Sequence, residues 1–133
     1  AEALDLAGGT RALLYVNPEA PVREAIDVMR AHGVSQLPVC KNTPPFAAAE
    51  VMGSVDELVL MSAAAADRAM LEVPVEQVMG DRLPTIGIGQ EVTRSIEALR
   101  SAPALLVLGG GRPWCVLTRS DVLGFLELGD DRD

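Results

Sequence analysis

Aromatic, histidine and lysine side chains are scarce in this 133-residue chain. Aromatic residues make up 3% of it, so the core must be aliphatic, in line with a hydrophobic content of 49%. The single histidine, His32, falls in the last turn of a predicted helix, where a positive charge is favourable. The single lysine, Lys41, lies in a proline-rich loop without the buried pocket that a Schiff-base lysine needs. Neither residue indicates catalysis.

Catalytic and metal-binding motifs are absent as well. No Gly-x-Ser-x-Gly, Walker or His-x-x-Glu pattern occurs, and the glycines at 109–111 lie between two strand-like runs, where they predict a turn. Two cysteines are too few for a disulfide framework or a zinc site. Cys40 and Cys115 lie in apolar runs, so we expect small buried thiols in a reduced compartment. We therefore expect no catalytic residues, no metal and no enzyme activity in this chain.

The balance of charge excludes two classes of partner. A net charge of −8 argues against nucleic acid and against anionic membranes, both of which need a cationic surface. We recognise no signal peptide and no apolar run long enough to span a bilayer, so we expect a cytoplasmic protein. The chain does not begin with Met, and we expect a neighbouring domain in the full-length protein.

What the chain does contain is one supersecondary unit written twice. A helical stripe at 21–30 returns about seventy residues later at 92–100. The matching positions are Val22 and Val92, Ile26 and Ile96, Met29 and Leu99, and Arg30 and Arg100. We expect a first repeat at 1–72 and a second at 73–133, sharing one core because each half is too small to be stable alone.

Each half has the element order strand, helix, strand, strand, helix. The first half predicts strands at 12–16, 35–40 and 50–55, with helices at 21–32 and 56–71. The second predicts a short helix at 73–79, an extended segment at 83–88, strands at 104–108 and 113–117, and helices at 92–101 and 119–128. This order predicts an α/β (α+β) fold in which each repeat is a small, mostly three-stranded sheet with helices on one face.

One constellation can hold a ligand. Thr118 and Asp121 lie where the last strand runs into the last helix. One interpretation is a capping pair that satisfies free N–H groups at the helix start. Alternatively, those N–H groups and Thr118 bind a polar tail, while Asp121 accepts two ribose hydroxyls and Val116 contacts a base. The sequence leaves both interpretations open.

The two halves resemble a tandem pair of CBS domains, a Bateman module, from about Thr10 to Phe125. The motif that ends such a domain is Gly-hydrophobic-x-Thr/Ser-x-x-Asp, and residues 116–121 match it, with Cys115 at the Gly position. The closer likeness is to the C-terminal regulatory region of bacterial cystathionine β-synthases. It is carried by the segments 22–26, 33–39 and 53–57.

The resemblance implies a bound adenosyl ligand, S-adenosylmethionine or an adenine nucleotide, and no cofactor that belongs to the chain itself. By position, the pocket would be lined by Val34, Ser35, Gln36, Val116, Thr118 and Asp121, with Ala12 and Leu13 contributing less. Core packing is the alternative for Val34, and a surface strand position is the alternative for Gln36. Arg119 is the one cation adjacent to this site in the sequence, which favours S-adenosylmethionine over a ligand with phosphates.

The first half departs from the family pattern. Asp56 takes the Thr position and Val59 takes the Asp position, so the ribose acceptor is missing. A carboxylate at Asp56 would repel a phosphate. We expect the first-half site to be closed to nucleotides, with Asp56 capping a helix.

The resemblance implies a non-catalytic regulatory module that senses an adenosyl ligand and dimerises a cystathionine β-synthase-like enzyme. The pyridoxal-phosphate catalytic domain of such an enzyme is not in this chain. An adenine-nucleotide sensor of another effector, such as a transporter or a transcription regulator, is one alternative. A structural dimerisation module without ligand is another. The apolar composition itself favours a homodimer that packs through helical faces.

Overall fold

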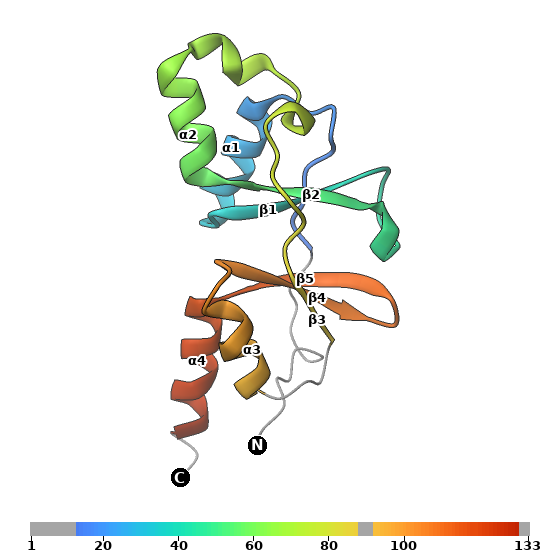
Figure 1. The fold of residues 1–133 in the computed structure, drawn as a ribbon, viewed down its shortest axis with the longest axis vertical. Helices are drawn as coiled ribbons and strands as arrows, with labels where there is room; N and C mark the ends of the chain where they lie inside the picture. Colours follow the sequence, from blue (N-terminus) through green and yellow to red (C-terminus); the bar gives the residue numbers. More distant parts are fainter. Residues whose placement is uncertain (1–12, 88–91, 131–133) are drawn as a thin grey trace. The chain divides into compact units, whose positions relative to one another are not determined.

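The computed structural model describes residues 13–87 and 92–130, which fall into two compact units (Figure 1). One unit is Leu14–Arg82, and the other contains Leu13 and the residues from Leu83 onward. Each has a small sheet with helices on one of its faces. The predicted fold class is therefore confirmed, while the division into repeats at 1–72 and 73–133 stays a prediction.

The sheet of the 14–82 unit is an antiparallel pair, β1 (Gln36–Cys40) and β2 (Val51–Asp56). Val16 adds to this sheet through an isolated parallel bridge with Val39 of β1. The Val16 N–H donates to the Pro38 carbonyl at 3.1 Å. The predicted strand at 12–16 is therefore wrong as a strand, since only Val16 pairs and Ala12 lies outside the described residues. After Val16 the chain turns at Pro18, which has no N–H to donate, so the pairing does not extend beyond Val16.

Helix α1 (Val22–His32) forms as its sequence predicts. Val22, Ala25 and Met29 recur at helical spacing and are all buried against the sheet. Gly33 ends the helix in the left-handed conformation, with a φ of 65° that glycine adopts without strain, and its N–H donates to the Met29 carbonyl.

Helix α2 (Glu57–Ala66) is shorter than predicted. The alanine-rich run favours helix up to Leu71, but the Asp67 side chain accepts the Ala69 N–H at 3.0 Å and starts a 3-10 helix, η2 (Arg68–Glu72). A short polar side chain that bonds the backbone competes in this way with helix continuation. Two further 3-10 helices are η1 (Ala48–Glu50) and η3 (Val75–Gln77), the latter replacing the helix predicted at 73–79.

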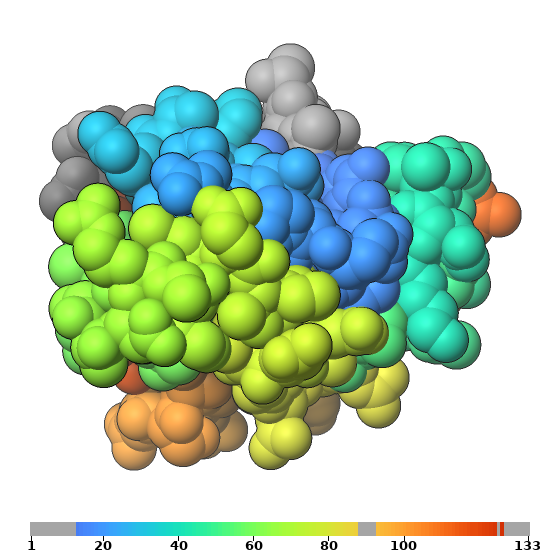
Figure 2. Space-filling model, turned by 90° about the horizontal axis from the view of Figure 1, so that it is seen from above, coloured from blue at the N-terminus to red at the C-terminus, as the bar shows by residue number. Residues whose placement is uncertain are grey.

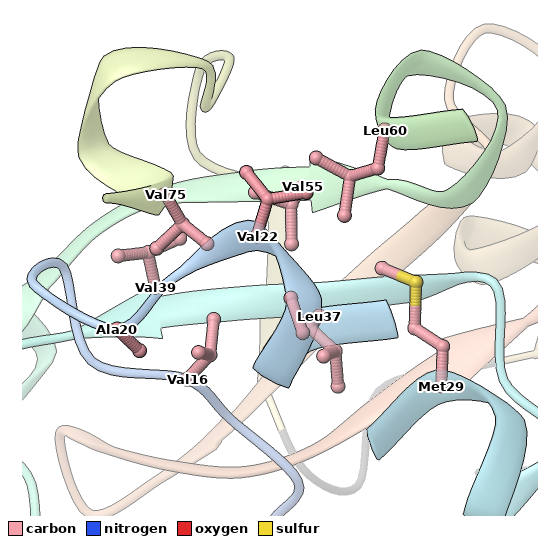
Figure 3. Packing of buried hydrophobic residues seen from close by; sticks show 10 residues of the cluster. Val16, Ala20, Val22, Met29, Leu37, Val39, Val55, Leu60 and Val75 are labelled. Carbon is pink, nitrogen blue, oxygen red and sulfur yellow. The ribbon is translucent and has the colours of Figure 1, made fainter. Parts of the chain in front are cut away.

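Helix α1 lies beside α2 and η2, and together they cover the unit on the face seen in Figure 2. Beneath them is an aliphatic core, in which Val22 of α1, Val55 of β2 and Leu60 of α2 come together (Figure 3). Complete burial of such side chains contributes about 1.5–3 kcal/mol each. The core contains Val16, Ala20, Val22, Ala25, Met29, Leu37, Val39, Val55, Leu60 and Val75.

The other unit has a three-stranded sheet in the order β3 (Thr85–Gly87), β4 (Ala104–Gly109), β5 (Arg112–Thr118). Strands β3 and β4 are parallel, and β4 and β5 form a hairpin. Gly110 and Gly111 make its turn with φ values of 60° and 76°, as the glycine run predicts. Helices α3 (Val92–Leu99) and α4 (Arg119–Asp130) pack against each other. Its core contains Ile86, Leu99, Leu105, Val107, Cys115, Leu117 and Val122.

Both cysteines are free thiols and buried, as predicted. Within the ranges that the structure describes, no helix is long and apolar enough to cross a membrane. The same ranges contain no cluster of His, Cys, Asp and Glu side chains that could hold a metal ion.

Candidate functional site

At the junction between β5 and α4, the two residues that the sequence singles out bond to each other. The Asp121 Oδ2 accepts the Thr118 N–H at 2.8 Å and the Thr118 hydroxyl at 3.0 Å. In return, the Asp121 N–H donates to the Thr118 Oγ1 at 3.2 Å. The predicted capping pair is therefore confirmed, and it holds a carboxylate at the first turn of α4.

Val116 lies on the same strand as Thr118 and two residues before it. Side chains two apart on a strand share a face, and both are half-buried, whereas Cys115 and Leu117 between and beside them are buried in the core. The structure thus brings Val116, Thr118 and Asp121 together at one half-buried junction, with an apolar side chain beside a hydroxyl and a carboxylate.

Three other predicted site residues belong to the 14–82 unit. Val34 is half-buried and packs against the core, so the core-packing interpretation describes it correctly. Ser35 is exposed, and its carbonyl accepts the Glu57 N–H at 2.9 Å. Gln36 is buried, which makes the surface-strand interpretation wrong, and its amide donates to the Asp56 carboxylate.

Asp56 is the N-cap of α2, as predicted. Its Oδ1 accepts the Leu58 N–H at 2.8 Å and the Val59 N–H at 3.1 Å, while Oδ2 accepts from Gln36. Three protein donors therefore converge on this carboxylate. Residues Gln36 and Asp56 are directly opposite each other in the β1–β2 register, which explains why they meet.

The remaining predicted residues are Leu13 and Ala12. Leu13 is half-buried and belongs to the unit that contains Thr118 and Asp121. Ala12 lies outside the described residues. Since Val34, Ser35 and Gln36 belong to the other unit, a pocket that combines the two sets stays a prediction.

Arg119 has a role that the sequence does not reveal. Its Nε donates to the Leu99 carbonyl at 2.9 Å and an Nη donates to the Ala102 carbonyl at 3.2 Å. The guanidinium thus satisfies carbonyls at the end of α3, where positive charge is also favoured by the helix dipole. The cation expected beside the candidate site is engaged with the backbone.

A cavity of about 550 Å³ lies between α3 and α4. We name it the α3–α4 groove. It is lined by Ile96, Leu99, Arg100, Arg119, Val122, Leu123 and Leu126. The sequence predicts apolar helical faces but not the position of this groove, because arginines such as Arg100 and Arg119 are typical of solvent-exposed helix positions.

Two comparisons with known proteins bear on this architecture. The sequence model of the CBS domain family matches residues 5–44. A CBS-domain-containing protein of Agrobacterium tumefaciens has a similar structure, with a TM-score of 0.74, 20% identity, and coverage of 90% of this chain and 87% of that one. The structure of CBSX2 in complex with AMP matches with a TM-score of 0.68 and 19% identity over 88% of this chain and 90% of that one.

A third similar structure is that of a CBS-domain-containing protein of unknown function from Bacillus anthracis. Its TM-score is 0.69 at 20% identity, with 86% of this chain and 84% of that chain covered. The chain therefore has the fold of CBS-domain proteins over most of its length, and its segment 5–44 matches the CBS domain by sequence.

Proposed function

We propose that this chain is a non-catalytic regulatory module that senses an adenosyl ligand at the β5–α4 junction, with S-adenosylmethionine favoured. The observation that carries the proposal is the Thr118–Asp121 pair beside Val116. A carboxylate has about four acceptor positions, so one that caps a helix can also accept the two hydroxyls of a ribose. Val116 would then contact the base.

The charge at the junction favours a cationic ligand. Phosphates are bound by arginine and lysine, but the Arg119 guanidinium is engaged with the Leu99 and Ala102 carbonyls. S-adenosylmethionine carries a sulfonium cation and needs no such partner. The net charge of −8 acts in the same direction.

An adenine nucleotide is the second candidate. It is supported by the AMP complex of CBSX2, a protein of the same fold. In that case the backbone N–H groups at the start of α4 would take the phosphate, and the chain would serve an effector other than a cystathionine β-synthase-like enzyme.

The wider proposal is that the chain is a tandem CBS pair from a cytoplasmic enzyme of the cystathionine β-synthase type. In such an enzyme the pair would be attached to a pyridoxal-phosphate domain, which this chain does not contain. It is supported by the internal repeat and by the segments 22–26, 33–39 and 53–57. We further propose that the module forms a homodimer through its helices, because large apolar side chains are exposed on α2, α3 and α4.

Parallel thermal shifts with S-adenosylmethionine, AMP, ADP and ATP test the proposal. Ligand at one hundred times its dissociation constant stabilises a fold by about 2.7 kcal/mol, or roughly 5–15 °C for a unit of this size. We expect S-adenosylmethionine to raise the melting temperatures of the wild type and of Asp56→Asn equally. It should raise the melting temperature of Asp121→Asn much less. No shift with any of the four compounds would leave a structural dimerisation module.

A further inference from the structure

The α3–α4 groove has no role in the adenosyl proposal, although it is built like a ligand site. Its volume of about 550 Å³ falls within the range of small-molecule pockets, which is roughly 300–1,000 Å³. Such pockets are mostly apolar and contain a few polar groups that fix the orientation of the ligand. The groove fits this description, because five of its seven lining residues are aliphatic and the other two are arginines.

The groove has a buried floor and exposed apolar walls, all within one unit (Figure 1). Leu99 and Val122 form the floor, since both are buried and belong to the core of that unit. Ile96, Leu123 and Leu126 are exposed and form the walls. Large apolar side chains that stay exposed together mark binding surfaces. An apolar chain that lies between these walls would remove them from water.

Both arginines lie at the same end of the groove. Arg100 directly follows the end of α3, and Arg119 is the first residue of α4. Arg119 also donates to the Leu99 and Ala102 carbonyls, which places its guanidinium at the end of α3. Leu126 lies seven residues further along α4, which is about 10 Å at the helical rise of roughly 1.5 Å per residue. The groove therefore has a cationic end and an apolar end.

We infer that the α3–α4 groove binds a single-chain carboxylate, such as a medium-chain fatty acid, with its carboxylate at Arg100 and its acyl chain between the two helices. No carboxylate occurs among the described lining residues, so an anion is not repelled there despite the net charge of −8. Arg100 is exposed, and a guanidinium can bind a carboxylate through two parallel N–H bonds. Arg119, held by the two carbonyls, adds a fixed positive charge.

The lining disfavours other classes of occupant. A phosphate monoester carries about 1.5–2 negative charges, and it would meet only one arginine that is not held by backbone carbonyls. An extended peptide would place N–H groups against lining side chains that offer no acceptor, and polar groups without partners are costly to bury. A carboxylate needs one arginine, and its chain needs only apolar contacts.

This site differs from the adenosyl site in its chemistry. The junction at Thr118 and Asp121 offers a hydroxyl and a carboxylate, which suit the hydroxyls of a ligand, whereas the groove offers guanidinium and aliphatic side chains. The walls of the groove also belong to the helices that we propose for the homodimer. A carboxylate in the groove and a partner copy on it would therefore exclude each other. The inference depends on neither of those two proposals.

Calorimetry with decanoate below its critical micelle concentration tests the inference on the whole chain. We expect saturable binding of one decanoate per chain. The affinity should rise roughly two- to fourfold for each CH₂ added from octanoate to dodecanoate. Decyltrimethylammonium has a tail of the same length and a cationic head, so it should bind at least tenfold more weakly. Binding that does not saturate, or that is equal for the two head groups, would overturn the inference.

Two arginine variants locate the head group. Arg100→Gln removes the guanidinium and should weaken decanoate binding roughly 3- to 10-fold, since the site is partly open to water. Arg94→Gln changes an exposed arginine of the same helix that does not line the groove, and it should leave the affinity unchanged. Equal losses in the two variants would indicate a general attraction to positive charge and would contradict the site.

Two leucine variants locate the acyl chain. Leu123→Asn places an amide on the α4 wall and should weaken decanoate binding tenfold or more, because apolar contact is lost. Leu58→Asn is the matched control, since Leu58 is also on a helix and is 69% exposed against 62% for Leu123. It lies in the other unit and should bind decanoate like the wild type.

The same titrations keep this inference separate from the adenosyl proposal. A wild type that binds S-adenosylmethionine but no decanoate would overturn the inference and leave the adenosyl site in place. A wild type that binds decanoate with the expected effects at Arg100 and Leu123, but no adenosyl compound, would support the inference and remove the adenosyl proposal.

Discussion

The two units start their second helix in different ways, although each start follows a strand and uses an aspartate. In the 14–82 unit, Asp56 is itself the N-cap and its carboxylate collects the Leu58 and Val59 N–H groups and the Gln36 amide. In the other unit, the carboxylate comes three residues later, from Asp121, and bonds back to Thr118.

The difference shows how one repeat can keep its fold while its junction changes chemistry. Both solutions pair N–H groups at the helix start with a side-chain oxygen. In the 14–82 unit, donors from β1 and α2 converge on the Asp56 carboxylate. In the second, the acid pairs locally with a hydroxyl next to the half-buried Val116. We propose that the second junction binds a ligand and that the first is closed.

The largest expected effect is at Asp121. If its carboxylate holds two ribose hydroxyls, each charge-assisted bond is worth roughly 1.5–3 kcal/mol. Asp121→Ala should therefore weaken ligand binding about a hundredfold or more in calorimetry. Loss of the cap costs up to about 1 kcal/mol of folding stability in addition.

Asp121→Asn separates these two consequences, because it keeps the shape and one acceptor oxygen but removes the charge. Binding should fall strongly while the melting temperature changes little. An Asn variant that binds as tightly as the wild type would contradict the role of the carboxylate.

Gly53 and Cys115 occupy the same position of the repeat, and exchanging them should be costly in one direction. A Cβ on Gly53 would lie 2.5 Å from the Gly80 carbonyl oxygen and 2.9 Å from the Met79 sulfur. Gly53→Cys should therefore destabilise the 14–82 unit by about 1–3 kcal/mol through overpacking, measured by urea unfolding.

Gly80→Ala is the control for that close approach, because nothing lies within 4 Å of a Cβ built there. We expect its stability to be close to that of the wild type. Equal losses for Gly53→Cys and Gly80→Ala would mean that this segment is sensitive to any side chain, and not to the contact of Gly53 with Gly80.

The β2–α2 junction can be given the residue pattern of the β5–α4 junction. Asp56→Thr with Val59→Asp removes the carboxylate that repels phosphate and restores an acceptor for ribose. We expect a loss of about 1 kcal/mol in stability, because the Gln36 amide loses its partner, and a gain of ligand stoichiometry in calorimetry. Tight nucleotide binding to the unmutated 14–82 unit would contradict this prediction.

The smallest effect concerns a hydroxyl. Ser95 is fully buried on α3 without a hydrogen-bond partner for its Oγ, whereas Ala25 is fully buried at the same position of the first repeat. An unsatisfied buried hydroxyl costs about 1–3 kcal/mol. Ser95→Ala should therefore raise the free energy of unfolding by about 1 kcal/mol, while Ala25→Ser should lower it by a similar amount.

Local patterns were sufficient where the cause is local. The Gly33 cap, the Thr118–Asp121 pair and the Asp56 cap each depend on residues within a few positions, and all are confirmed. The pairing of Gln36 with Asp56 depends on strand register, which the sequence does not specify. The bonds of Arg119 reach carbonyls 17 and 20 residues away. No periodic pattern predicts them.

The residue at which α2 ends could not be predicted from the sequence either. Alanine propensity favours helix through the region, and it is the Asp67 side chain that ends the helix by bonding the Ala69 N–H. The strand predicted at 12–16 differs as well, because among its described residues Val16 alone pairs, in an isolated bridge with Val39.

The burial of the two thiols gives each unit a chemical reporter of its own opening. Desolvation, with a smaller contribution from the Glu50 carboxylate, raises the pKa of Cys40 to about 11, so little thiolate exists at pH 8 while the unit is closed. Because only the thiolate is alkylated, modification of Cys40 requires opening of the 14–82 unit. Cys115 is buried in the core of the other unit, so its modification requires opening of that unit. Timed alkylation followed by mass spectrometry can therefore measure the local unfolding of both units in a single sample.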